Sequence, residues 1–215
     1  MKLALCILAV FGFVSALLPD GKQAILDAHN KLRSDIAKGI FKSGIFIKPK
    51  AANMRKLRWD SALEASAQEE ADRCQKDDRT QIGVNIYEAP THENVRLKSL
   101  QFKKKTEDFQ PDQVTKSWEN EFQDRNWYGT MMGIHSFHSP MRHAIQMVWA
   151  ETSSIGCGAN TCGTRNEGYR TTYVCHYNEI GNKMYAEIYK TGETCSACSE
   201  GFKCETDTGL CDKIS

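Results

Sequence analysis

The sequence predicts an α+β protein in which helices pack around a mainly antiparallel sheet. Segments with apolar residues at helical spacing lie in the first 150 or so residues, and strand-like segments follow them. Two of the strand-like segments are joined by a hairpin signal. The 199 residues after residue 16 are enough for one sizeable core, so any second unit should be small.

The first helix is predicted to begin with a capping box at Asp20 and to run to about Lys38, before a stop at Gly39. Its inward stripe contains either Ala28 or His29, so His29 is expected on or beside the buried face. The apolar members of the stripe are Ile25, Leu32 and Ile36.

A second helix is predicted from Asp60 to about Cys74, and a third from Asp112 to about Asp124. Glu121 falls on the apolar side of the third helix. A buried carboxylate is unfavourable unless it is paired, hydrogen-bonded or bound to a metal. Glu121 is therefore expected to have a partner.

A fourth helix is predicted from Ser139, a suitable N-cap, to about Thr152. Its residues leave almost no polar face, so it should be buried on most sides. His143 and Gln146 are the polar side chains inside it. His143 is either a satisfied core histidine or part of a site.

The predicted strands after this helix are Ser154–Ala159, Thr171–Tyr177 and Lys183–Tyr189. The segment Asn178–Asn182 is the hairpin signal that joins the last two. A short apolar piece, Ile82–Tyr87, precedes the third helix.

Residues Met1–Ala16 have the features of a secretory signal peptide: one lysine, an apolar run and small residues at the exit. Its removal leaves 27 basic and 27 acidic residues. Such a balance argues against general nucleic-acid binding, which needs a basic excess. No later stretch is apolar for long enough to span a membrane, so we expect a secreted, extracellular protein.

Removal of the leader also takes away Cys6 and leaves eight cysteines, an even number in an oxidising compartment, so disulfides are the default. The last 25 residues, 191–215, contain four of them at close spacing with little apolar content. We interpret this segment as a disulfide-stapled appendage rather than part of the main core. A zinc site is the alternative for these four thiols.

Several motifs occur in the order and spacing of the CAP superfamily, which the chain resembles over residues 20–211. They are His29-Asn30-Lys31-Leu32-Arg33, Leu57-Arg58-Trp59-Asp60, Arg142-His143-Ala144-Ile145-Gln146-Met147-Val148-Trp149 and Cys175-His176-Tyr177-Asn178-Glu179-Ile180-Gly181-Asn182. With its short cysteine-rich tail, the chain is most similar to single-domain venom allergen-like secreted proteins of nematodes. The resemblance implies a three-layer α-β-α sandwich, with a CAP domain at 17–190 followed by the extension at 191–215.

The resemblance also implies disulfides Cys74–Cys162 and Cys157–Cys175. The sequence leaves three pairings open for the tail, of which we expect Cys195–Cys204 with Cys198–Cys211.

Family members often carry two histidines and two acids in a central cavity, a set that can hold zinc. Here the resemblance maps Glu121 and His143 onto half of this set. The position of the other acid is Val84, and the other histidine has no counterpart after Cys74. One imidazole and one carboxylate cannot close a zinc site, so we expect no metal and no cofactor, with Glu121 and His143 forming a hydrogen-bonded pair. His135 and His138, in the loop before the fourth helix, are weak substitutes for the missing ligands.

Catalysis is not expected. The chain has no Gly-x-Ser-x-Gly or His-Glu-x-x-His motif and no free mature thiol once eight cysteines pair. Ser136 and Ser139 lie near His143 in sequence, but no orienting acid or oxyanion hole accompanies them.

Two lipid sites are predicted instead, for which plain core packing is the alternative. An apolar loop would accept a sterol, as the corresponding loop does in sterol-binding relatives. Its residues are Phe122, Trp127, Tyr128 and Phe137. The first and fourth helices would hold a fatty acid between their apolar faces. This groove would consist of Ile25, Leu32, Ile36, Met141, Ile145 and Val148.

The sequence thus predicts a secreted, non-catalytic protein, a monomer or weak dimer, that binds sterols or fatty acids. The resemblance to worm proteins adds a role in modulating host immunity. One alternative is an effector that binds a host protein through its central groove and the basic stretch Arg96–Lys105. The other is a zinc-dependent hydrolase with a rebuilt site.

Overall fold

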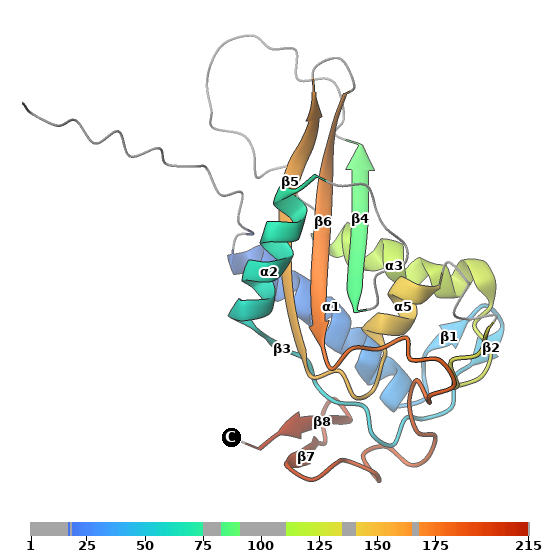
Figure 1. The fold of residues 1–215 in the computed structure, drawn as a ribbon. Helices are drawn as coiled ribbons and strands as arrows, with labels where there is room; N and C mark the ends of the chain where they lie inside the picture. The colour runs from blue at the N-terminus through green and yellow to red at the C-terminus, as the bar shows by residue number, and fades with distance from the viewer. Residues whose placement is uncertain are drawn as a thin grey trace, which may run out of the picture.

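A four-stranded sheet forms the middle of the molecule in the computed structural model, which describes residues 17, 19–74, 83–90, 111–134, 141–164 and 168–214 (Figure 1). The predicted leader, the basic stretch Arg96–Lys105, both loop histidines His135 and His138, and Ser136, Phe137 and Ser139 lie outside these residues.

The strand order of the sheet is β3 (Arg58–Trp59), β5 (Ser154–Thr164), β6 (Gly168–Asn178) and β4 (Val84–Pro90). The pair β3–β5 is parallel and the other two pairs are antiparallel. The predicted mainly antiparallel sheet is confirmed.

Helices cover both faces of this sheet (Figure 1). Side chains of a strand alternate between the two faces of a sheet. The contacts of two consecutive residues of β6 therefore show which helices lie on each face. His176 contacts Ser66 of α2 (Ser61–Asp72). Tyr177 contacts His29 of α1 (Pro19–Ala37), which lies on the other face with α3 (Pro111–Arg125) and α5 (Arg142–Met147). The α-β-α sandwich is confirmed.

The helix α2 lies directly on the backbone of β5. Asp60 is its N-cap and accepts hydrogen bonds from the N–H groups of Ala62 and Leu63. A Cβ atom added at Gly158 would lie 2.4 Å from Cα of Gln68. The glycines of β5 therefore allow this close approach.

The predicted fourth helix is shorter than expected, because α5 ends at Met147. The next residues turn so that their carbonyl groups point at the buried guanidinium of Arg33, on α1. The guanidinium of Arg33 donates hydrogen bonds to five carbonyls at 2.8–3.1 Å, those of Arg55, Met147, Trp149, Ala150 and Thr152. A continued helix would have used such carbonyls internally.

The prediction of a strand at Lys183–Tyr189 is wrong, and so is the hairpin placed before it. Tyr185 has a φ of +61°, which interrupts an extended conformation. This segment bonds instead to the loop after α3: Tyr185 N–H donates to Met132 O, and Ile188 N–H donates to Thr130 O. The long hairpin of the sheet is β5–β6.

Two small antiparallel ribbons complete the described fold. The first consists of β1 (Lys42–Ser43) and β2 (Phe46–Ile47), and the second of β7 (Phe202–Glu205) and β8 (Leu210–Lys213). The structure contains the disulfides Cys74–Cys162, Cys157–Cys175, Cys195–Cys204 and Cys198–Cys211, the same pairs that we expected.

The cysteine-rich tail is attached to the main core, contrary to the interpretation as an appendage. Leu210 is fully buried and belongs to the same hydrophobic cluster as Leu32 and Ile36 of α1. Backbone hydrogen bonds join Cys211 to both Met54 and Lys56. Apolar burial therefore extends into the tail even though its composition is polar.

Candidate functional site

Glu121 and His143 form the hydrogen-bonded pair at the centre of the candidate site. The Nδ1 of His143, on α5, lies 2.6 Å from Oε1 of Glu121, on α3. The other carboxylate oxygen accepts the backbone N–H of Ala144 at 3.0 Å. The imidazole also stacks on Trp118, with ring centroids 6.1 Å apart. The carboxylate of Glu121 therefore has the partners that its partly buried position requires.

This geometry gives the two residues different chemical roles. With both oxygens engaged, Glu121 orients the imidazole as a carboxylate does behind a metal-ligating histidine. The described residues engage only Nδ1 of His143, so its Nε2 atom is the nitrogen left for a ligand. One nitrogen does not close a zinc site, which needs three or four protein ligands.

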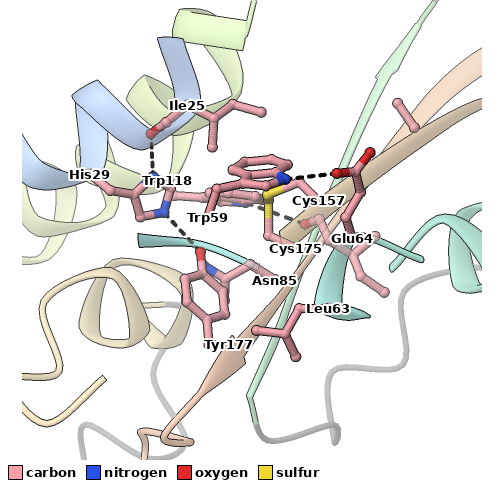
Figure 2. The surroundings of a disulfide bond; sticks show 12 residues. Ile25, His29, Trp59, Leu63, Glu64, Asn85, Trp118, Cys157, Cys175 and Tyr177 are labelled. Atoms are coloured by element: carbon pink, nitrogen blue, oxygen red, sulfur yellow. Dashed lines mark hydrogen bonds between the residues drawn. A yellow bond between two sulfur atoms is a disulfide. The ribbon is translucent and has the colours of Figure 1, made fainter. Parts of the chain in front are cut away.

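A chain of hydrogen bonds connects the pair to α1, and Figure 2 shows its members Ile25, His29, Tyr177 and Asn85. His29 donates from Nδ1 to the Ile25 carbonyl at 2.8 Å, so its Nε2 accepts from the Tyr177 hydroxyl at 2.9 Å. The Asn85 amide donates to that hydroxyl at 3.1 Å and to the carbonyl of His143 at 3.0 Å. Each donor in this chain has an acceptor, and the network fixes α5 against the sheet.

Burial decides the charge state of this network. It lowers the pKa of His29 to about 4, even though the hydrogen bond to Ile25 favours the charged form. Burial also raises the pKa of the Tyr177 hydroxyl above its ordinary value. Both groups are therefore neutral at physiological pH. Neutral groups that satisfy one another are typical of a structural network.

Val84 does not face this network. It packs with Ile86 against Ala67 and Ala71 of α2, whereas Asn85 faces α1 and α5. Among the described residues, the side chains grouped closely enough for a metal are Cys195, Cys198 and Cys211, all in disulfides. The described residues around His143 therefore do not fit a zinc ion.

A second histidine pair, Ser66 with His176, lies on the α2 face of the sheet. The Oγ of Ser66 is 2.8 Å from Nδ1 of His176 and 3.0 Å from the carbonyl of Leu63. A hydroxyl that donates its proton to a carbonyl one turn earlier is behaving as an ordinary helical serine. Burial lowers the pKa of His176. This arrangement does not activate Ser66 as a nucleophile.

The predicted sterol loop divides between the core and the surface. Phe122 and Trp127 are fully buried and stack on each other with centroids 4.3 Å apart. The prediction is corrected for these two side chains, because Phe122 lies in α3 and both fill the core. Tyr128 is exposed, and Phe137 lies outside the described residues. Sequence spacing could not separate the buried side chains from the exposed one, since all four predicted residues are aromatic.

The six residues of the predicted fatty-acid groove all lie in the continuous core. Their side chains are at most 8% exposed, so they pack together and do not form an open groove between α1 and α5; only Leu32 also reaches a groove elsewhere. An open groove of about 390 Å³ lies instead between α1 and α3, a position that the sequence analysis did not predict. Ala28 and Leu32 contribute apolar surface to it, and ion pairs Lys31–Asp35 and Lys116–Glu119 lie at its sides.

The sandwich, its disulfides and the motif residues in their places define a class of secreted proteins. The sequence profile of the CAP, or cysteine-rich secretory protein, family matches residues 26–177. The chain belongs to this family.

Its relatives include venom and worm proteins. A Scoloptoxin of Scolopendra dehaani is 33% identical over 89% of the chain and 83% of its own length. The Ancylostoma secreted protein of Ancylostoma caninum is 30% identical over 88% of the chain. The chain spans 43% of that relative, and 46% of a Cysteine-rich venom protein of Tityus serrulatus.

Solved structures with the same fold include BmVAL-1, with a TM-score of 0.77 at 29% identity, over 93% of this chain and 97% of the other. A crystal structure described as NaASP2 with Zn²⁺ has a TM-score of 0.73 at 28% identity, over 91% and 97% of the two chains. Four disulfides and these secreted relatives indicate an extracellular protein. In the part of the chain described, no helix has the length and apolar character of a membrane span.

Proposed function

We propose that this protein is a secreted, non-catalytic CAP protein that binds lipids, with a sterol as the first ligand to test. The observation that carries the proposal is an exposed apolar surface on the loop after α3. Tyr128, Met131 and Ile134 are each more than half exposed there. Several large apolar side chains exposed on one short loop are typical of a binding site.

The loop is held from beneath. Trp127 and Met132 are fully buried, and Lys48 lies 3.8 Å from the centre of the Trp127 ring. The Nζ of Lys48 donates to the carbonyl of Gly129 at 2.8 Å. Buried anchors on both sides of Tyr128 and Met131 keep these two side chains at the surface. A flat, rigid sterol could lie across them without a large rearrangement.

The test is a titration of the purified protein with a fluorescent sterol in sterol-free buffer. The wild type should saturate at micromolar concentration. The double variant Tyr128→Ser/Met131→Ser should bind at least about tenfold more weakly, since two large apolar contacts are lost. Ile214→Ser is the matched control, because Ile214 is an exposed apolar residue at the end of the tail. Absence of saturable binding by the wild type would overturn the proposal.

A fatty acid is the second lipid of the proposal. Its predicted site is closed core here, so binding there requires α1 and α5 to separate. A parallel titration with a fluorescent fatty acid tests this. Saturable binding that is lost in Ile145→Gln but retained in Tyr128→Ser/Met131→Ser would indicate that the fatty acid lies between the two helices.

The open groove between α1 and α3 favours protein binding as a second candidate function. Its sides carry both cationic and anionic side chains, and polar mixed-charge surfaces suit protein partners more than acyl chains. The double charge reversal Lys31→Glu/Lys116→Glu should weaken the retention of a host partner and make that retention less sensitive to salt. Sterol binding should be unchanged. If the variant retained the partner as well as the wild type does, this groove would be excluded as the partner's binding site.

The biological role that we propose is an effector released to act on a host. It is supported by the resemblance to worm and venom proteins, with the predicted leader Met1–Ala16 as the export signal. Mass spectrometry of protein secreted by eukaryotic cells should find a chain that begins after Ala16 with all eight mature cysteines oxidised. A retained leader would contradict the export route.

A further inference from the structure

The hairpin of β1 and β2 presents large apolar side chains to solvent. Ile45, at its tip, is 88% exposed, and Ile47 and Ile40 are each about 60% exposed. Single exposed apolar residues are normal, but neighbouring ones mark interaction sites. We call residues 40–48 the isoleucine hairpin.

The isoleucine hairpin has an inner and an outer face, because strand side chains alternate. Ser43 and Lys48 point inward and are buried, whereas Lys42 and Ile47 are exposed. Lys42 and Ile47 are also cross-strand partners. The inner face already fills its place in the fold, so the outer isoleucines contribute nothing to the core.

The hairpin is firmly attached to the end of α3, beside which it lies in Figure 1. The hydroxyl of Ser43 donates to the Phe122 carbonyl and accepts the N–H of Trp127, both at 2.7 Å. Gln123 accepts the N–H of Gly44 at 2.9 Å and donates to the carbonyl of Lys42 at 2.7 Å. A pre-ordered loop loses little conformational entropy when it binds.

The stretch of sequence that contains the hairpin is basic. From Ile36 to Trp59 the chain has seven lysines and arginines and no acidic residue. Most of these are engaged elsewhere, but Lys42 is exposed and makes no ion pair with any described residue. Arg125, at the end of α3 next to the hairpin, is also exposed and makes no ion pair with a described residue. Its acidic neighbour in the sequence is Asp124.

We propose that the isoleucine hairpin is the contact of this protein with an anionic lipid bilayer. Ile45 and Ile47 enter the acyl region, and Lys42 meets the lipid phosphates. Phe46 packs on Tyr128 with centroids 5.2 Å apart, and this aromatic pair lies at headgroup depth, where such rings are favoured. A stable protein interface buries about 800 Å² per partner, more than a narrow hairpin tip offers, so a bilayer fits better than a second protein.

This inference extends the proposed function, because it gives a lipid-binding protein access to the membranes that hold its ligand. It does not depend on sterol binding. Vesicles without sterol therefore test it separately from the sterol titration.

The experiment is flotation of the full chain with sterol-free vesicles of phosphatidylcholine containing 30% phosphatidylserine, against vesicles of phosphatidylcholine alone. The wild type should float with the anionic vesicles and less with the neutral ones. Ile45→Ser/Ile47→Ser should reduce partitioning at least about tenfold, because two inserted side chains are lost. Lys42→Glu should reduce it about fivefold or more, and added salt should shrink this difference.

Ile214→Ser is the control and should float as the wild type does. Circular dichroism and thermal unfolding establish that each variant is folded, which exposed substitutions should permit. The proposal is overturned if the wild type does not float, or if Ile45→Ser/Ile47→Ser floats equally well. It is also overturned if the wild type forms a dimer that the double variant dissolves while vesicle binding is unchanged, since the hairpin would then be an interface between two copies.

Discussion

Arg33 has the most demanding environment of any single described residue. Its side chain is fully buried, and its guanidinium donates five hydrogen bonds to main-chain carbonyls. Four of the five acceptors lie in residues 147–152, at the last residue of α5 and just beyond it. The planar, permanently charged fork of arginine supplies all of these donors at once, which lysine cannot do. Arg33 thereby shapes the chain that follows the motif helix.

Replacement of Arg33 by leucine should destabilise the protein by at least about 4 kcal/mol, because several buried carbonyls would lose their donors. Arg33→Lys should be intermediate. Arg125→Leu, at an exposed position, should change stability by less than about 0.5 kcal/mol. Urea unfolding of the three variants measures this. A similar stability for Arg33→Leu and Arg125→Leu would contradict the role given to Arg33.

His29 should make the fold sensitive to acid. Burial lowers its pKa from 6.5 to about 4, so the unfolded chain binds the proton more readily than the folded one. The contribution of neutral His29 to the free energy of unfolding is complete above pH 6.5. This contribution is lost as the pH falls from 6.5 towards 4. The loss should amount to about 3 kcal/mol.

The comparison that isolates this effect is wild type against His29→Gln, unfolded by urea between pH 7.5 and 4. Glutamine cannot titrate, so the variant should have the shallower dependence on pH, although its stability at pH 7.5 should be lower. Carboxylates and His176 contribute equally to both curves. Parallel curves would show that His29 does not couple folding to pH.

At the scale of elements, the contact between α2 and β5 depends on glycine. Cβ atoms at Gly156 and Gly158 would meet the backbone of α2 at 2.1 and 2.4 Å, and a backbone cannot rotate away as a side chain can. Gly158→Ala should therefore destabilise the protein by about 2 kcal/mol or more through overpacking. Gly133→Ala is the control, because no described residue lies within 4 Å of its added Cβ.

Thermal and urea unfolding of these two variants give the comparison. Gly133→Ala should be neutral or slightly stabilising, since alanine restricts the unfolded chain. A Gly158→Ala variant as stable as Gly133→Ala would mean that α2 can move outward at little cost.

Elements with local start and stop signals were predictable from the sequence. The helix α2 begins after its cap Asp60, and α1 ends at Ala37 just before Gly39. The early end of α5 and the irregular segment 183–189 were not predictable. Both depend on partners distant in sequence: Arg33 for the first, and the loop at Thr130–Met132 for the second.

The candidate site was predictable only in part for the same reason. The register of known motifs placed Glu121 opposite His143, and these two residues are in contact. The roles of Asn85 and Tyr177 could not be read from spacing, because the network joins three elements through β6. Burial of Phe122 and Trp127 also depends on tertiary packing, which an aromatic-rich sequence does not reveal.

At the scale of the whole molecule, the tail and the sandwich share one hydrophobic core. Leu210 lies in that core, and polar contacts add to the attachment: Ser34 donates to the carbonyl of Thr208 at 2.5 Å, and Arg58 pairs with Asp212 at 3.0 Å. Two tail disulfides hold this ribbon in place. The tail should therefore unfold together with the sandwich.

Leu210→Ala tests this expectation. Loss of a fully buried leucine should destabilise the protein by about 2–4 kcal/mol, and the loss should appear in the unfolding of the whole chain. We expect one urea transition, followed in parallel by tryptophan fluorescence and circular dichroism, that moves to lower urea with an unchanged slope. The control Ile214→Ser removes an exposed side chain from the same tail and should leave the midpoint in place. A separate early transition for the tail, with the main midpoint unmoved, would instead make residues 191–215 an independent unit. In that case their contacts with α1 would not stabilise the sandwich.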